Sequence, residues 1–250
     1  MQAIYCHQPE PGIVDLNGKL RLHESMRVTT AEVGRERLPV LVVDNFLGDP
    51  DILVDWAAQH GAFDGVRDAF YPGVRAPIPQ IYPFAVRTFL GSAIDAVFKL
   101  GNGAVRAELS HFSLVTTPPA RLNVPQRMPH FDNTNPKQLA ILHYLCRAEC
   151  GGTSFYRHRR TGFEFVDAAR RADYLRAVGE DLSAAEHLPC RYVCGSDPLF
   201  ERTASFAAEF NRVVIYRSIN LHSADIAVDF RFDSNPRSGR LTANTFFFYD

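Results

Sequence analysis

The sequence predicts an α+β protein in which helices pack on one face of a mostly antiparallel sheet or barrel. Two segments with apolar residues at helical spacing, Ile52–His60 and Ile81–Leu100, lie within residues 1–103. From residue 104 onward, short runs rich in β-branched and aromatic residues are separated by Pro, Gly and Asn clusters. Helices followed by many short strands are typical of this class. The 19 Phe and 9 Tyr against a single Trp agree with a β-rich core.

Residues 1–103 are expected to provide mainly helical support and a few strands. Asn17-Gly18 between short alternating runs predicts a tight hairpin turn. The apolar, β-branched run Leu38–Val43 predicts a buried strand, and Asp49-Pro50-Asp51 predicts the start of the first helix. The Pro/Gly-rich segment Phe70–Pro79 predicts a rigid connector before the second helix, with a lid over a site as the alternative. The buried stripe of the second helix is expected to comprise Phe84, Val86, Phe89, Leu90, Ile94, Val97 and Phe98.

Residues 104–250 are expected to form the β-sheet core, interrupted by the helical intervals Phe165–Leu182 and Pro198–Phe210. The predicted strands are Ala104–Thr116, Leu139–Cys146, Thr153–His158, Arg212–Arg217 and Leu241–Tyr249. Because no repeat, low-complexity tract or Gly/Ser linker divides the chain, residues 1–250 are expected to form a single domain.

Composition narrows the possible partners and the compartment. The 27 Lys and Arg balance 28 Asp and Glu, so no global field would attract nucleic acid or an acidic membrane. The basic run Arg157–Arg160 is expected to be a solvated loop. The N-terminus lacks the pattern of a secretory signal, and no apolar run of membrane length is recognised. We therefore expect a cytoplasmic protein without a nucleic-acid or membrane partner.

The five cysteines are expected to be reduced thiols. Cys146 and Cys150, like Cys190 and Cys194, are separated by three residues, which superficially resembles two halves of a zinc site. The two-residue spacer of a zinc knuckle is the commoner pattern, so buried small apolar residues are the favoured interpretation.

The strongest candidate for chemistry is the triplet His130-Phe131-Asp132. In an extended segment the side chains of His130 and Asp132 point to the same side. His222 follows the predicted strand Arg212–Arg217 and provides a third candidate ligand. Two histidines and one carboxylate leave one face of an octahedral metal open, which is the arrangement of non-haem Fe(II) oxygenases.

The run from His130 to Arg240 resembles the 2-oxoglutarate/Fe(II)-dependent dioxygenases, particularly their prolyl-4-hydroxylase-like branch. The segments that match in order are His130-Phe131-Asp132, Leu139–Leu145 with its Tyr-Leu end, Gly151–Tyr156, Asn211–Tyr216 with His222, and Gly239–Thr242. Thr153 stands where the family usually has an acidic residue. The resemblance implies a double-stranded β-helix, or jelly roll, over residues 104–250 with flanking N-terminal helices.

The resemblance also implies the cofactors, Fe(II) and 2-oxoglutarate, and their ligands. His130, Asp132 and His222 would bind the iron, and no further catalytic residue is implied. Arg240, helped by Tyr144 and Thr242, would bind the far carboxylate of 2-oxoglutarate; Asn123, Asn244 and Phe246 are candidates for the substrate pocket. His143 would face away from Tyr144 and be structural.

Arg231 is the rival to Arg240. It follows His222 by nine residues, nearer the family's usual spacing, whereas Arg240 follows by eighteen and requires residues 223–238 to form an inserted loop. Arg240 is preferred because it begins a β-rich terminal run that can lie beside the His222 strand, with Thr242, Asn244 and Phe246 on its face.

The predicted function is therefore an oxygenase that hydroxylates a C–H bond of a small-molecule or peptidyl substrate. The presence of Asp132 disfavours halogenation, which in this superfamily goes with loss of the carboxylate ligand. Two alternatives are a catalytically silent jelly-roll binding or scaffold protein and a cupin-like metal enzyme that does not use 2-oxoglutarate.

Overall fold

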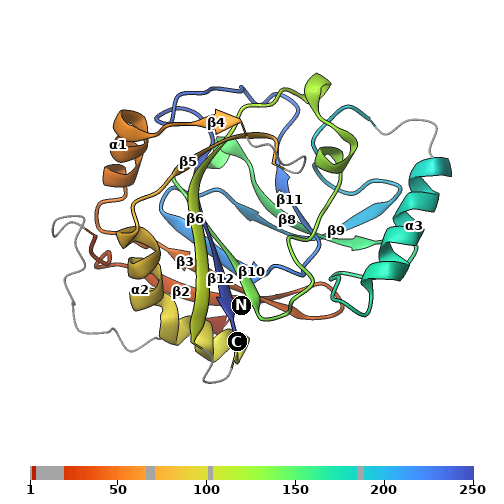
Figure 1. The fold of residues 1–250 in the computed structure, drawn as a ribbon, viewed down its shortest axis with the longest axis horizontal. Helices are drawn as coiled ribbons and strands as arrows, with labels where there is room; N and C mark the ends of the chain where they lie inside the picture. Colours follow the sequence, from red (N-terminus) through yellow and green to blue (C-terminus); the bar gives the residue numbers. More distant parts are fainter. Residues whose placement is uncertain (1, 4–19, 66–70, 101–103, 185–188) are drawn as a thin grey trace.

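Two antiparallel sheets form the framework of the computed structural model (Figure 1). It describes residues 2–3, 20–65, 71–100, 104–184 and 189–250. The turn predicted at Asn17-Gly18 and the thiol of Cys6 lie outside the described residues. The strands are β1 Gln2–Ala3, β2 Arg27–Val33, β3 Leu38–Asp44, β4 Asp64–Gly65, β5 Gly73–Pro77, β6 Val105–Val115, β7 Gln138–Tyr144, β8 Gly152–His158, β9 Phe200–Ala207, β10 Arg212–Arg217, β11 His222–Asp225 and β12 Leu241–Tyr249.

The helices flank these sheets on two sides. The α-helices are α1 Asp51–His60, α2 Ile81–Phe98 and α3 Arg171–Ala184, and the 3₁₀ turns are Pro119–Arg121, Val124–Arg127 and Ala148–Cys150. Helices α1 and α2 lie together on one side of the molecule, and α3 lies on the opposite side near β8 and β9 (Figure 1). The α+β class is confirmed, with a mostly antiparallel sheet and few helices.

The large sheet has nine strands in the order β1-β2-β3-β10-β7-β12-β6-β5-β4, and the small sheet has the order β11-β8-β9. An isolated antiparallel bridge joins His130 to His222, so the segment around His130 lies at the free edge of β11. The last strand, β12, lies between β6 and β7 in the large sheet, so the C-terminal strand pairs with the first strand of residues 104–250.

Each face of the large sheet has its own apolar core. One core lies between α1, α2 and the outer face, and includes Leu90 of α2 and Phe247 of β12. The other lies between the two sheets and includes Val214 of β10 and Phe155 of β8. Strand β12 confirms the predicted alternation, because Leu241, Ala243 and Phe247 belong to the outer core whereas Phe246 packs against the inner one.

Helix α2 is long and apolar enough to cross a membrane by length and composition, in contrast to the sequence-based expectation. Half of it is buried in the protein, and its buried residues pack in the outer core. It is a core helix of the fold. One residue of its predicted stripe was wrong: Phe84 is 43% exposed.

Several predicted elements differ in the structure, and the helical interval predicted from Phe165 begins only at Arg171. The interval Pro198–Phe210 contains β9 in place of a helix, because the backbone from Phe200 to Ala207 pairs on one side with β8. The segment expected to be a connector, Phe70–Pro79, contains β5, which pairs with β6. The first three residues of the predicted insertion 223–238 belong to β11.

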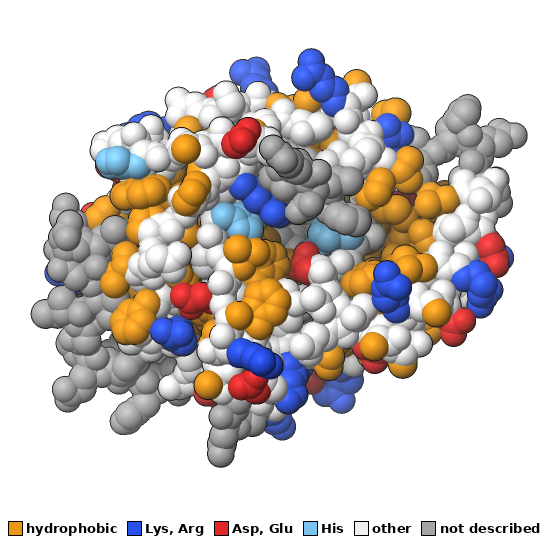
Figure 2. Space-filling model, in the orientation of Figure 1, with side chains coloured by type: hydrophobic (Ala, Val, Ile, Leu, Met, Phe, Trp, Pro, Cys, Tyr) orange, Lys and Arg blue, Asp and Glu red, His pale blue; other side chains and the backbone are white. Residues whose placement is uncertain are grey.

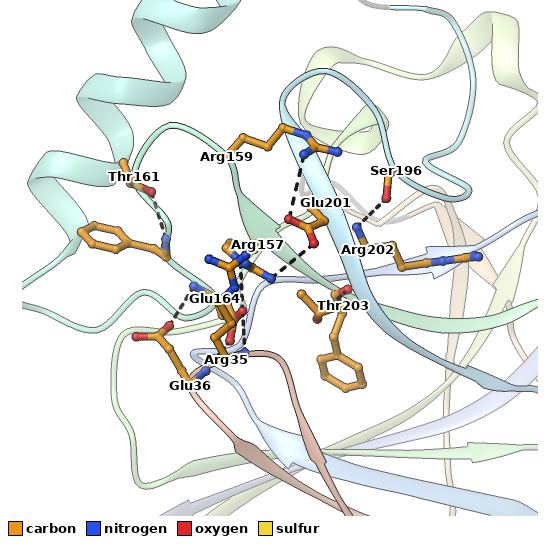
Figure 3. A network of polar contacts seen from close by, with 12 residues as sticks. Arg35, Glu36, Arg157, Arg159, Thr161, Glu164, Ser196, Glu201, Arg202 and Thr203 are labelled. Carbon is orange, nitrogen blue, oxygen red and sulfur yellow. Dashed lines mark hydrogen bonds and ion pairs between the residues drawn. The ribbon is translucent and has the colours of Figure 1, made fainter.

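A buried carboxylate ties the β2–β3 turn to the small sheet (Figure 3). Glu164 is 2% exposed and accepts hydrogen bonds from the backbone N–H groups of Arg35 and Glu36, at 2.9 and 2.8 Å. Arg157 of β8 contacts the same carboxylate at 3.1 Å. Gly34 has φ +71°, and a Cβ there would lie 2.1 Å from a carboxylate oxygen of Glu164. The prediction that Arg157–Arg160 is a solvated loop is therefore wrong for its first two residues, because Arg157 and His158 are buried in β8.

Candidate metal centre

Backbone hydrogen bonds place the two histidines opposite each other on neighbouring segments. The N–H of each donates to the carbonyl of the other, at 2.9 Å in both directions, across the bridge between the His130 segment and β11. The N–H of Asp132 donates to the carbonyl of Ser218 at 2.8 Å, which places the carboxylate beside the turn after β10. Pairing of these distant segments positions the predicted triad.

The side chains converge with the spacing of metal ligands. Nε2 of His130 lies 3.7 Å from Oδ1 of Asp132, and Nε2 of His222 lies 3.7 Å from Oδ2. These separations are too long for hydrogen bonds but fit two groups that share an ion at about 2.1 Å from each. His130, Asp132 and His222 form the one group of three or more potential ligands found among the described residues, with ligand atoms within 4.8 Å of one another.

The orientation of His222 suits metal binding. Its Nδ1 lies 2.9 Å from the carbonyl oxygen of Asn220, so Nδ1–H donates there and Nε2 keeps its lone pair toward the cluster. The side chain of His222 is 7% exposed and that of Asp132 is 20% exposed. Histidine side chains are visible near the middle of the face in Figure 2, in the region where Figure 1 places β11. The cluster is thus buried at His222 and partly accessible to solvent at Asp132.

Burial keeps both imidazoles neutral. It lowers the pKa of His222 to about 4. It also lowers the pKa of His130 to about 4, with a smaller lowering from His222 and an opposing effect of Asp132. Burial raises the pKa of the Asp132 carboxyl. Two neutral imidazoles and one carboxylate are a suitable set of ligands for a divalent cation. The positive charge of the cation would offset the cost of burying the carboxylate.

Arg240 is a buried cation that donates hydrogen bonds to backbone carbonyls. It is 3% exposed, Nε donates to the carbonyl of Cys150 at 2.9 Å and Nη2 to that of Gly152 at 2.8 Å. None of the ion pairs among the described residues includes it. Its guanidinium carbon lies 5.8 Å from the ring centre of Tyr144. A buried guanidinium without an acidic partner is suited to binding an anionic ligand.

Tyr144 is oriented by a contact with Thr153. Its hydroxyl lies 2.6 Å from Oγ1 of Thr153, and the side chain is fully buried. Burial raises the pKa of Tyr144 to about 12, partly offset by the charge of Arg240, so the phenol stays protonated. On the other face of β7, His143 contacts the Tyr82 hydroxyl and the Asn211 amide, both at 3.1 Å. Its predicted structural role agrees with these contacts.

Strand register places several polar side chains on the inner face of the large sheet. Ser113 of β6 is opposite Thr242 of β12, which in turn is opposite Tyr144 of β7. In the next inward row, His111 is opposite Asn244. The Asn244 amide nitrogen donates to Ser113 Oγ at 3.0 Å, whereas Asn244 Oδ1 and His111 Nε2 are buried without a hydrogen-bond partner among the described residues.

The register also reveals site residues that sequence reasoning missed. Arg75 of β5 is opposite Ser113 and therefore joins the same row. Burial lowers the pKa of His111 to about 3, and the charge of Arg75 lowers it further. Phe246 stacks on His111 with ring centres 6.1 Å apart. A cationic residue within the Pro/Gly-rich segment 70–79 was the only signal in the sequence.

The remaining candidates lie elsewhere. Asn123 is exposed, and its side chain accepts from the Gln126 N–H as the cap of the 3₁₀ turn Val124–Arg127. Arg231 is exposed. The expectation that the Arg240 strand lies beside the His222 strand is wrong: β12 is separated from β10 by β7, and β11 belongs to the small sheet. Separation into two sheets still allows both residues to face the same interior.

The cysteine pairs do not form a zinc site among the described residues. Cys146 and Cys150 are buried, as the favoured interpretation predicts, but Cys190 and Cys194 are exposed.

Comparison with protein families gives one match. Residues 24–247 match DUF6445, described as a family of unknown function. A comparison with curated proteins found no match.

Comparison with solved structures gives several distant neighbours. The non-haem alpha-ketoglutarate-dependent carbocyclase SnoK from nogalamycin biosynthesis is 13% identical, with a TM-score of 0.46 over 89% of this chain and 86% of that one. HygX from Streptomyces hygroscopicus, with nickel and 2-oxoglutarate bound, is 11% identical, with a TM-score of 0.44 over 83% and 82%. A prolyl-4-hydroxylase from Pseudomonas putida is 13% identical, with a TM-score of 0.38 over 80% and 99%. At such scores, any assignment of activity depends on the geometry of this chain's own site.

Proposed function

Because the chain belongs to DUF6445, a family of unknown function, we propose its activity from the site itself: a non-haem Fe(II), 2-oxoglutarate-dependent oxygenase that hydroxylates a C–H bond. One observation carries the proposal. His130, Asp132 and His222 converge on one point, and Arg240, which reaches the start of β8 in the small sheet, is buried without an acidic partner among the described residues. The donor set suits a metal with open coordination positions, and the free cation suits an anionic co-substrate.

The strand order supports a double-stranded β-helix. In the large sheet, the central strands follow the order β6-β12-β7-β10. In the small sheet, the His130 segment, β11, β8 and β9 follow one another. Apart from the consecutive pair β8 and β9, the segments from β6 to β12 alternate between the two sheets, as in a jelly roll. The assignment to the prolyl-4-hydroxylase-like branch depends on the sequence motifs alone and is part of the proposal.

The ligand residues would bind the iron through three positions and leave the opposite face open. Iron bound there, with O₂ and 2-oxoglutarate, supplies the oxidising power for attack on an unactivated C–H bond. The chain's own contribution is to keep His222 in the correct tautomer through the Asn220 carbonyl and to keep both imidazoles unprotonated.

Arg240, Tyr144 and Thr242 would bind the far carboxylate of 2-oxoglutarate. Arg240 supplies charge, and its two contacts with backbone carbonyls fix its direction before any ligand arrives. Tyr144 supplies a neutral hydroxyl whose position is set by Thr153. Thr242 lies opposite Tyr144 in the register, so its hydroxyl shares the inner face.

Asn244 and Phe246 would line the substrate side of the pocket, together with His111. The partnerless Asn244 Oδ1 and His111 Nε2 are buried polar atoms, and a bound small molecule or peptidyl group can satisfy them. Asn123, on the exposed turn before the His130 segment, would contact the substrate at the rim. We further propose a cytoplasmic location, with no nucleic-acid or membrane partner.

An anaerobic titration tests this function. Fe(II) is added to metal-free protein, followed by 2-oxoglutarate, and the visible charge-transfer band of the iron chelate is recorded. A saturable band that is lost in Asp132→Ala supports the proposal. Iron binding without a band favours a cupin-like enzyme that does not use 2-oxoglutarate, and absence of iron binding by folded protein favours a silent jelly-roll scaffold.

A further inference from the structure

Two buried thiols contact each other beside the Arg240 site. Cys146 follows the end of β7, and Cys150 ends the 3₁₀ turn Ala148–Cys150. The residues are 6% and 7% exposed, and their thiol groups are hydrogen-bonded to each other. The N–H of Cys150 donates to the carbonyl of Arg147 at 2.9 Å, which closes the turn and keeps the sulfurs together.

The same turn positions the guanidinium of Arg240. The carbonyls of Cys150 and Gly152 accept its two hydrogen bonds. Between them, Gly151 has φ +84°, and a Cβ there would lie 2.0 Å from the carbonyl oxygen of Asp225. Only glycine therefore fits, and the backbone from Cys150 to Gly152 is packed tightly against β11. A displacement of the Cys150 carbonyl would be transmitted directly to Arg240.

The two sulfurs differ in chemistry. Donation from the Cys146 thiol lowers the pKa of Cys150 to about 7, with further lowering from the Arg147 backbone and the Arg240 charge against an opposing effect of burial. The hydrogen bond with Cys150 and burial raise the pKa of Cys146. These opposite shifts favour a thiolate on Cys150 beside a protonated thiol on Cys146, the combination needed for attack and resolution.

We propose that Cys146 and Cys150 are a modification site for hydrogen peroxide, which converts the pair into an intramolecular disulfide. The Cys150 sulfur attacks one oxygen of the peroxide, the O–O bond breaks, and the other oxygen leaves as hydroxide, which takes up a proton to form water. The Cys146 sulfur then attacks the resulting sulfenic acid, the S–S bond forms, and the hydroxyl group leaves with the Cys146 proton as a second water. Two electrons pass from the thiols to the peroxide.

The disulfide also acts on the co-substrate site, a consequence that rests on the proposed function. Sulfurs at hydrogen-bond distance must approach each other to form a covalent bond, so the turn is pulled toward Cys146. This movement shifts the Cys150 carbonyl and misdirects Arg240. We expect oxidation to weaken the binding of 2-oxoglutarate at least tenfold while the iron ligands keep their affinity, because the close contact of Gly151 with β11 is at Asp225, three residues from His222.

Peptide mapping tests the modification itself. Trypsin places Cys146 in Gln138–Arg147 and Cys150 in Ala148–Arg157, so the disulfide joins two peptides and removes two hydrogens. Metal-free protein is treated with stoichiometric to tenfold hydrogen peroxide, blocked with iodoacetamide and digested. We expect the cross-linked pair to dominate and to disappear after reduction with dithiothreitol.

The second cysteine pair provides a matched control. Cys190 and Cys194 have the same spacing, and trypsin also places them in separate peptides, but both are exposed. Faster or equal cross-linking of this exposed pair would overturn the proposal, as would alkylated Cys146 and Cys150 after peroxide treatment. In Cys146→Ser, the sulfenic acid on Cys150 should be trapped by dimedone. Trapping on Cys190 or Cys194 alone would also overturn the proposal.

The effect on the co-substrate site is measured after peroxide has been removed and Fe(II) has been added anaerobically. Oxidised and dithiothreitol-treated samples are titrated with 2-oxoglutarate through the charge-transfer band. A tenfold difference that is absent in Cys146→Ser supports the coupling, and equal affinities with a complete disulfide refute it. If reduced wild type shows no band, the proposed function fails, whereas the mapping result stands independently.

Discussion

Replacement of Arg240 by methionine tests the placement of the co-substrate. The substitution removes the guanidinium but keeps an unbranched apolar side chain in its buried position, which limits the loss of packing. Arg240 is 3% exposed and has no acidic partner among the described residues, so the incoming carboxylate would supply its counter-charge. Without the cation, that carboxylate is desolvated and unpaired.

The expected loss follows from the burial of this pair. Truncating one partner of a buried, hydrogen-bonded charge pair costs about 2–5 kcal/mol. At about 1.4 kcal/mol per factor of ten, this range corresponds to a ~30- to ~4,000-fold weaker affinity. Arg240→Lys retains the charge but cannot reproduce the planar fork that contacts the Cys150 and Gly152 carbonyls, so we expect an intermediate loss.

The affinity is measured by anaerobic titration of Fe(II)-loaded protein with 2-oxoglutarate. Arg231→Met is the matched control, because Arg231 is exposed and should change the affinity less than twofold. Thermal unfolding and Fe(II) binding are recorded for each variant, since Arg240→Met also leaves two backbone carbonyls without a donor. A folded, iron-binding Arg240→Met variant with an affinity within threefold of wild type would refute the assignment, and a large loss in Arg231→Met alone would point to the rival arginine.

Three further predictions concern the metal and the stability of the fold. His130→Ala, Asp132→Ala or His222→Ala should each abolish tight Fe(II) binding with little change in melting temperature, because the cluster decorates preformed backbone pairing; wild-type affinity in a metal titration excludes that residue as a ligand. Glu164→Ala should lower the free energy of unfolding by about 3–5 kcal/mol in a denaturant titration, because two backbone N–H groups lose their acceptor and the Arg157 guanidinium, 10% exposed, keeps only Glu201, at 3.5 Å; a loss below about 1 kcal/mol would contradict a stabilising role of Glu164. Burial would raise the pKa of Asp44, but hydrogen bonds from two arginines outweigh it and lower the pKa below 3.8, so this carboxylate stabilises the fold above that value and the benefit is lost as the pH falls through the lowered pKa. Asp44→Asn should therefore reduce the stability difference between pH 6 and pH 3, and an unchanged difference would remove Asp44 from that dependence.

Local patterns in the sequence predicted the elements whose residues repeat with a clear period. Apolar spacing predicted α1 and α2 to within two residues of their ends, and β10 and β12 have the predicted bounds. The His130–Asp132 spacing predicted two side chains directed to one point, and the structure brings them together with His222. These features depend on neighbours within a few positions, which is why the sequence alone was sufficient.

Partners that are distant in the chain were decided by the tertiary structure. Residues 198–210 carry a pattern compatible with a helix, yet pairing with β8 makes residues 200–207 a strand. Pairing with β6 likewise makes the expected connector around Arg75 a strand of the large sheet, between β6 and β4. The contrast between buried Arg240 and exposed Arg231 likewise depends on which backbone carbonyls lie nearby. Sequence periodicity determines which face of an element is apolar, but the free energy of long-range strand pairing and burial determines what that face contacts. The candidate ligands were therefore visible in the sequence, and the residues around them were not.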